Sequence, residues 1–403
     1  MNIKMMTAKV MLAVCAHGVV GAGMSAMADP HRPRSHESVI QVKSEEKNRA
    51  GLQAALDQAV CCNNHRYKEA IDLFEMIQKT GTPSPRDFYF AAFSYMRLYL
   101  PEKADPLLKL AKQAGFSGFG SSSGWPTVND LLSRIRAVRE LTPPSENNRL
   151  GLSDHFPVTL YADAVTSWSE PVMRAVPEFS VIGLKVFDAR LPPIRLYLFS
   201  DRGRFERFFT TLYLVPPRPD QHGTGNTNSV VFCDRDSRGI VTREAGSPET
   251  IGAVLHEFGH AWVISYVMYT HNRNFIGRPL RTPWLDEGLA DYIAFLREYN
   301  YLKRREDWII QNKVKRNIEP PRLEELKDYS SFHDQGDREL HYWLSALLTA
   351  QILGPGDKGA KLIPKLLDAF VETKDAESAV KMVTGKNVRK EYEKLIARFW
   401  QRN

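Results

Sequence analysis

The stretch AVLHEFGHAW (residues 253–262) places His256 and His260 four residues apart, with Glu257 directly after the first histidine. On an α-helix, residues i and i+4 lie on one face, so the two imidazoles can bind a single metal ion, with Glu257 pointing near the same position. The alternative is that both histidines are core residues of a buried helix, where each ring needs its own hydrogen-bond partner. A shared metal ion would satisfy both rings at once.

A second stretch, PWLDEGLADY (residues 283–292), supplies carboxylates for such a site. A catalytic zinc takes three protein ligands and leaves one position open, so a third ligand is required. Glu287 lies in the first turns of the helix that this stretch predicts, and Asp291 lies one turn on, on the same face. We expect Glu287 to be the third ligand and Asp291 to accept the free N–H of a ligating histidine. Asp286 is an alternative candidate for either role. The acidic residues of the first turn would otherwise serve only to complement the helix dipole.

HEFGH and WLDEGLADY together resemble the gluzincin metallopeptidases, the thermolysin- and aminopeptidase-like clan that holds zinc with two histidines and one glutamate. The form of the second motif is most similar to the peptidase-MA-like branch found in exported bacterial proteins. The match covers roughly residues 155–370. The resemblance implies one Zn²⁺ per chain, bound by His256, His260 and Glu287, with Glu257 as the general base. Asp291 sits where thermolysin-like members place the aspartate behind a ligand.

One departure from the best-known members is the spacing between the ligands. The interval between His260 and Glu287 is longer than in those members. The extra length coincides with the basic stretch THNRNFIGRPLR (residues 270–281), which we expect to form a loop at the rim of the cleft.

The family chemistry implies a further donor for the oxyanion that develops during hydrolysis. Zinc lowers the pKa of its bound water to about 7, and Glu257 takes the water proton and passes it to the leaving nitrogen. In DRELHYWLSALL (residues 337–348), Tyr342 resembles the oxyanion-stabilising tyrosine of aminopeptidases, and His341 is the alternative, since thermolysin-like members use a histidine. Structural packing of Tyr342 is the competing interpretation.

The resemblance also implies an edge strand that holds the substrate backbone, for which GNTNSVVFCD (residues 225–234) is the candidate. No GxMEN-like stretch precedes it, so the amine anchor of true aminopeptidases is missing. This favours an endopeptidase or a peptidase with a dedicated substrate over removal of N-terminal residues.

The N-terminal stretch 1–28 has the pattern of an export signal. Lys4 and Lys9 precede a mostly apolar stretch over residues 10–23, and Ala26-Met27-Ala28 is an A-x-A cleavage site. The apolar stretch is too short to span a bilayer, and no later stretch predicts a transmembrane helix. We expect a periplasmic or secreted protein; the alternative is a disordered or membrane-anchoring N-terminus.

The composition limits the classes of partner. The formal charge of +7 falls to +5 without the two leader lysines, a modest excess typical of a solvated surface, and no basic run interleaved with aromatic residues suggests nucleic acid. The cysteines after the leader are Cys61, Cys62 and Cys233. Adjacent cysteines pair only with strain, so a disulfide scaffold is not expected, and we interpret all three as small buried apolar residues.

Residues 29–48 read as a flexible lead-in and residues 49–141 as an all-α region. Within the latter, YKEAIDLFEMIQKTG (67–81) aligns without gaps with PEKADPLLKLAKQAG (101–115), and Pro106 is expected to shorten the second helix. The offset of about 34 residues is typical of tetratricopeptide (TPR) repeats, whose surface is suited to a protein or peptide partner. The alternative is a plain domain of helical hairpins.

The proline- and asparagine-rich stretch at 142–151 marks a domain boundary, followed by a zinc metallopeptidase-like domain over residues 152–403. Half-buried strands are expected at 156–163 and 194–201, with a third strand at 228–234. Expected helices lie near 170–188, 202–214, 248–270, 284–302, 338–353, 357–371 and 388–402. The predicted fold class is therefore α+β: a gluzincin-like catalytic domain with a small mixed sheet, the HExxH helix and C-terminal helices, preceded by an all-α helical-repeat region.

The sequence thus predicts an exported zinc peptidase. The rival hypothesis is a catalytically inactive protein of the same fold that binds partners through its helical repeats. The presence of ligands, base and supporting aspartate favours the enzyme.

The leader interpretation predicts that the exported protein begins at Asp29, because signal peptidase cleaves after the small residues of an A-x-A site. N-terminal sequencing of the protein recovered outside the cytoplasm tests this. Retention of Met1 in that material would contradict the interpretation.

Overall fold

The computed structural model describes residues 36–60, 66–119, 125–143, 147–150, 158–162, 169–187, 192–233, 248–271, 280, 282–297, 300–333 and 338–400. The chain divides into two compact units, Met1–Lys47 and Asn48–Asn403. The expected leader lies outside the described residues. Helix α1 (His36–Val60) begins inside the stretch 29–48 that we expected to be a flexible lead-in.

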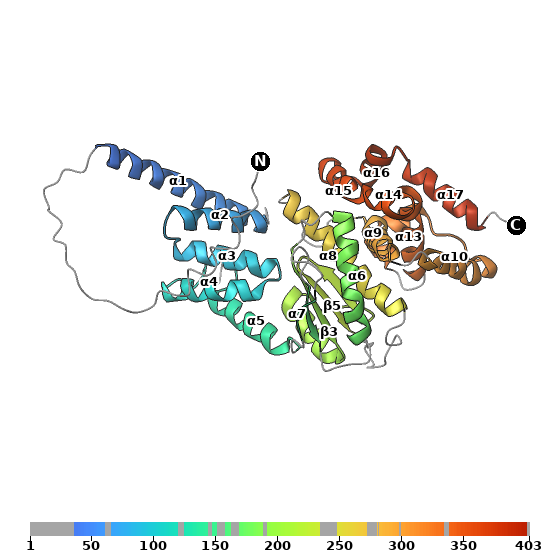
Figure 1. Ribbon diagram of the computed structural model, residues 1–403, viewed down its shortest axis with the longest axis horizontal. Helices are drawn as coiled ribbons and strands as arrows, with labels where there is room; N and C mark the ends of the chain where they lie inside the picture. Colours follow the sequence, from blue (N-terminus) through green and yellow to red (C-terminus); the bar gives the residue numbers. More distant parts are fainter. Residues whose placement is uncertain are drawn as a thin grey trace. The chain divides into compact units, whose positions relative to one another are not determined.

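Four further helices follow: α2 (Tyr67–Thr80), α3 (Pro85–Arg97), α4 (Pro101–Gln113) and α5 (Val128–Leu141). Each packs on the next, and Figure 1 shows α2, α3 and α4 stacked side by side. The two stretches that align with each other in the sequence form α2 and α4.

Helix α4 continues past Pro106 to Gln113. The expectation from the sequence that Pro106 shortens this helix is therefore wrong. The missing N–H of Pro106 would have bonded the carbonyl of Glu102, in the solvent-exposed first turn. An orphan carbonyl there is satisfied by water, so the cost of the proline is small.

The strands are β1 (Asn147–Leu150), β2 (Val158–Ala162), β3 (Ile194–Phe199), β4 (Gly223–Asn226) and β5 (Ser229–Cys233). They form one mixed sheet in the order β1-β2-β3-β5-β4, with β2, β3 and β5 parallel and the outer strands β1 and β4 antiparallel to their neighbours. Strand β1 lies within the stretch that the sequence marked as a domain boundary. The described chain is mostly helical with one small mixed sheet, so the predicted α+β class is confirmed at this level.

Strands β3 and β5 of the sheet are buried on both faces, whereas β2 alternates between buried and half-buried residues. Leu196 packs in a cluster with residues of α6 (Ser169–Phe187) and α8 (Pro248–His271), whereas its neighbour Tyr197 packs with α7 (Arg202–Tyr213). The expected half-buried pattern is therefore wrong for β3. Parallel strands are joined by helical crossovers, which cover both faces of a sheet.

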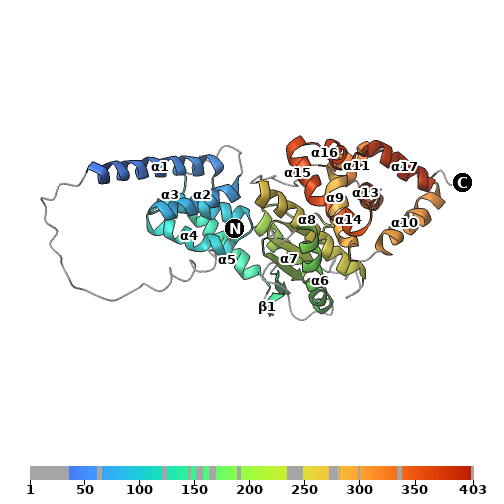
Figure 2. The same ribbon diagram turned by 45° about the horizontal axis from the view of Figure 1, so that its top comes forward.

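The C-terminal part of the chain is helical and surrounds α9. The expected single helix over 284–302 is in fact two, because α9 ends at Phe295, and α9 is buried along its whole length. Figure 2 shows the orange and red helices grouped around α9 and α13. The helices are α9 (Pro283–Phe295), α10 (Asn300–Asn312), α11 (Leu323–Lys327), α12 (Tyr329–Phe332), α13 (Arg338–Leu353), α14 (Gly356–Ala360), α15 (Leu362–Thr373), α16 (Ala376–Thr384) and α17 (Val388–Trp400), with a 3-10 turn at Val314–Arg316.

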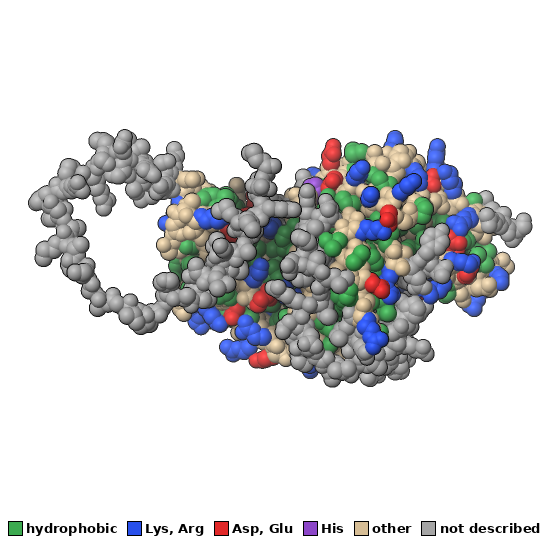
Figure 3. Space-filling model, in the orientation of Figure 1, with side chains coloured by type: hydrophobic (Ala, Val, Ile, Leu, Met, Phe, Trp, Pro, Cys, Tyr) green, Lys and Arg blue, Asp and Glu red, His purple; other side chains and the backbone are tan. Residues whose placement is uncertain are grey.

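The surface carries charges of both signs. On the face shown in Figure 3, Lys and Arg side chains over the C-terminal helices are interspersed with Asp and Glu. Cys233 is buried, as expected, while Cys61 and Cys62 lie outside the described residues. Among the helices that the structure describes, none is both long enough and apolar enough to cross a bilayer.

Helices α8 and α9 approach each other backbone to backbone at Gly259. A Cβ atom at this position would lie 2.8 Å from the Cα atom of Ala290 on α9, closer than real Cβ contacts allow. Glycine is required here because of this close approach, even though it is a poor helix former.

We predict that Gly259→Ala lowers the free energy of unfolding by about 1–3 kcal/mol, because the added methyl group overpacks the α8–α9 contact. Gly51→Ala is the matched control, since Gly51 lies in helix α1 and its added Cβ would meet nothing within 4 Å. That change should raise the stability by up to about 1 kcal/mol. Denaturant unfolding measures both, and equal stability of the two variants would refute the packing argument.

Candidate metal centre

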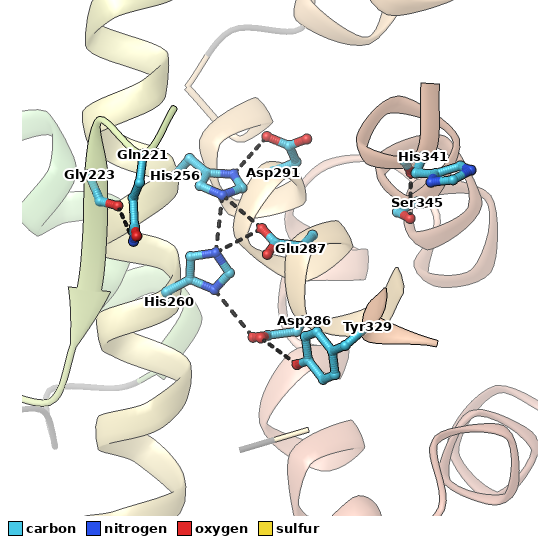
Figure 4. Close-up of polar contacts among 10 residues, drawn as sticks. All are labelled: Gln221, Gly223, His256, His260, Asp286, Glu287, Asp291, Tyr329, His341 and Ser345. Atoms are coloured by element: carbon cyan, nitrogen blue, oxygen red, sulfur yellow. Dashed lines mark hydrogen bonds and ion pairs between the residues drawn. The ribbon is translucent and has the colours of Figure 1, made fainter. Parts of the chain in front are cut away.

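Three side chains from α8 and α9 converge on one point (Figure 4). The Nε2 atoms of His256 and His260 lie 3.1 Å apart. Oε2 of Glu287 lies 3.2 Å from Nε2 of His256 and 3.0 Å from Nε2 of His260. The i, i+4 spacing on α8 aims both imidazoles at α9, and Glu287 meets them from the second turn of that helix.

The geometry of these atoms fits a zinc ion. Tetrahedral coordination with bonds of about 2.0–2.1 Å places ligand atoms about 3.3 Å apart, close to the separations observed here. Two imidazole nitrogens and one carboxylate oxygen are also the donor set of many catalytic zinc sites. Among the described residues, these three form the group of His, Cys, Asp and Glu side chains that could hold a metal ion.

A second carboxylate stands behind each imidazole. Oδ1 of Asp291 accepts from Nδ1 of His256 at 2.8 Å, and Oδ1 of Asp286 accepts from Nδ1 of His260 at 3.2 Å. With Nδ1 protonated, the Nε2 lone pairs face the centre, as metal ligation requires. The sequence analysis assigned Asp291 to this position and offered Asp286 as its competitor, whereas the structure places one aspartate behind each histidine.

Electrostatics at the centre favour positive charge. Burial lowers the pKa of His256, but the charge and hydrogen bond of Asp291, with a hydrogen bond to Glu287, raise it to about 9. Burial likewise opposes protonation of His260, and Glu287 and Asp286 raise its pKa well above the usual range. Buried carboxylates require compensating charge, which either protons or a metal ion can supply here.

The centre opens into a cavity of about 710 Å³ between β4, α8 and α13. Glu257 lines this cavity and lies against β4: a Cβ atom on Gly223 would be 3.1 Å from its Oε1 atom. A Cβ atom on Gly225 would be only 1.7 Å from the carbonyl oxygen of Glu257, so only glycine allows the strand to lie this close to α8.

The edge strand differs from the one that the sequence predicted over 225–234. That stretch is a hairpin, which turns at Thr227 and Asn228, and its second half is the interior strand β5. The edge strand beside the cavity is β4. Asn228 adopts a φ of 61°, which asparagine tolerates better than most residues, and this places the turn inside the predicted strand.

The two candidates for the oxyanion donor lie in different places. Tyr342 lines the cavity, and its ring centroid is 6.3 Å from that of His256. His341 is 3% exposed, donates from Nδ1 to the carbonyl of Phe332 at 3.1 Å, and does not line the cavity. Figure 4 shows it well apart from the metal-ligand candidates. Of the two candidates, only Tyr342 lines the cavity, so the structure corrects the alternative of His341.

Sequence reasoning missed an ion pair at the cavity. Arg338, at the start of α13, pairs with Asp220, which precedes β4, and both line the cavity. No local pattern signals this pair, because its members lie far apart in the sequence. The basic stretch expected at the rim, residues 270–281, lies mostly outside the described residues.

Comparison of the chain with family models, curated proteins and solved structures found no match. The geometry and the chemistry of the site are therefore the observations from which a function can be inferred.

We predict that Asp291→Asn and Asp286→Asn each weaken zinc binding about 10- to 100-fold, because each aspartate orients one ligating imidazole. Asp368→Asn is the matched control, since that carboxylate contacts His271 at the far end of α8. Competition titration with a zinc chelator measures the affinities. Wild-type affinity in both site variants, or undiminished zinc in His260→Ala, would refute the assignment.

Proposed function

We propose that this protein is a zinc-dependent peptidase of the gluzincin type, in which His256, His260 and Glu287 hold the metal. The observation that carries the proposal is the convergence of these three ligand atoms inside a cavity that Glu257 also lines. The aspartates behind both imidazoles add support, since such partners are usual at zinc sites.

The bound ion would supply Lewis acidity, which lowers the pKa of water to about 7 and polarises a carbonyl group. Glu257 accepts a proton from the attacking water at its carboxylate. As the carbon–nitrogen bond breaks, the same carboxylate returns that proton to the leaving nitrogen. Glu257 suits this role because it follows His256 on α8 and faces the cavity without belonging to the ligand set.

Other residues of the cavity suit substrate binding. Strand β4 lies at the end of the sheet and pairs with β5 along one edge. An extended peptide can therefore pair with its other edge by strand addition. The hydroxyl of Tyr342 would donate to the oxyanion from α13. A cleft that binds backbone in this way suits an endopeptidase.

The helix pairs α2–α3 and α4–α5 would be tetratricopeptide-like and offer a surface for a protein partner. The N-terminal stretch 1–28 would direct export, with the enzyme acting in the periplasm or outside the cell.

We predict that Glu257→Gln retains zinc but loses about 10²- to 10⁴-fold in kcat against a peptide library, because the amide cannot carry the proton. Glu178→Gln is the matched control, since Glu178 lies on α6 and pairs with Arg297 away from the cavity. Turnover and zinc content are measured together. Undiminished turnover in Glu257→Gln would contradict the role of the base, and zinc binding without turnover in the wild type would favour an inactive binding protein.

A further inference from the structure

The turn between β4 and β5 is buried, which is unusual because connections normally run over the surface. Thr227 and Asn228 are each 1% exposed. Their cover comes from the corner between α3 and α4 (Leu98–Leu100) and from the C-terminal half of α8.

Polar contacts fix the turn on both sides. The side-chain amide of Asn228 donates to the carbonyl of Leu98 at 3.0 Å and accepts from the hydroxyl of Tyr269 at 3.2 Å. On the edge strand itself, Nδ2 of Asn226 donates to the hydroxyl of Tyr99 at 3.1 Å. The corner of the helical region therefore contacts the strand that lines the cavity.

Apolar packing holds the corner against the helix that carries the metal ligands. Leu98 and Leu100 share a buried cluster with Ile264 and Met268 of α8. Ile264 also lines the cavity. The packing extends from the helical region to the catalytic cleft without interruption.

Tyr99 adopts a backbone conformation that points to a specific role. Its φ is 58°, in the left-handed region that large aromatic residues rarely occupy. Such a conformation costs of order 1–3 kcal/mol and persists only where surrounding contacts impose it. Here it carries the Tyr99 ring to within 4.8 Å of that of Tyr213, with the hydroxyl at Asn226.

We propose that the α3–α4 corner is a clamp that sets the position of the edge strand β4, with Tyr99 as a positioning residue for substrate binding. Asn226 lines the cavity, and the adjacent Gly225 touches the backbone of Glu257, so a displaced turn shifts the strand on which a substrate pairs. The helical region is on this account part of the catalytic unit. Only the kinetic consequences of this inference rest on the proposed peptidase function.

The test compares two hydroxyl deletions on neighbouring tyrosines. Tyr99→Phe removes the contact with the edge strand and keeps the ring, whereas Tyr213→Phe removes a contact with Ser229 on the interior strand β5. We expect Tyr99→Phe to raise KM for extended peptides about 3- to 10-fold, the equivalent of one lost hydrogen bond, with little change in kcat. Tyr213→Phe should leave KM unchanged.

Hydrogen exchange of the β4 amides gives a readout that does not depend on activity. Tyr99→Phe should speed exchange across Gly223–Asn226, and Tyr213→Phe should not. The β4 amides of the double variant Tyr99→Phe/Asn226→Ala should exchange no faster than those of Asn226→Ala alone, because the two residues act through one contact. Unchanged exchange in Tyr99→Phe, or equal effects of both tyrosine variants, would overturn the clamp. A wild-type protein without peptidase activity would instead refute the proposed function and leave the exchange result to decide on the clamp.

Discussion

Three buried carboxylates beside one half-buried and one buried imidazole, His256 and His260, are the constraint on which the rest of the structure depends. Asp286, Glu287 and Asp291 all lie on α9, and each is at most 4% exposed. Removing such charges from water costs several kcal/mol per ion unless they are compensated. Either protons on the two histidines or a divalent cation can supply that compensation.

Close backbone approach gives the site its shape. Gly259 brings α8 onto α9, and Gly225 brings β4 onto α8 beside Glu257. On the other side of α9, a Cβ atom on Gly288 would lie 2.6 Å from the carbonyl oxygen of Ser345, so α13 also packs closely. The candidate ligands, Glu257 and the cavity are thus positioned by close approaches of the main chain.

The sequence predicted those features that depend on local spacing. His256 and His260 could be paired because helix periodicity places i and i+4 together, and the same argument placed Asp291 behind a ligand. The edge strand at 223–226 was predicted only in its second half, as the front end of the stretch 225–234, because its sequence GTGN has no alternating apolar pattern to signal a strand. The contact of Tyr99 with the edge strand joins distant parts of the chain and depends on tertiary packing alone, so no local pattern predicts it.

In the proposed enzyme, α8 and α9 form a zinc site with two nitrogen ligands and one oxygen ligand from the protein. X-ray absorption at the zinc edge of the zinc-loaded protein tests this most directly. We expect one zinc per chain with four or five nitrogen and oxygen neighbours at about 2.0–2.2 Å and a signature of two imidazoles. A sulfur neighbour at about 2.3 Å, or a shell without imidazole, would contradict the claim.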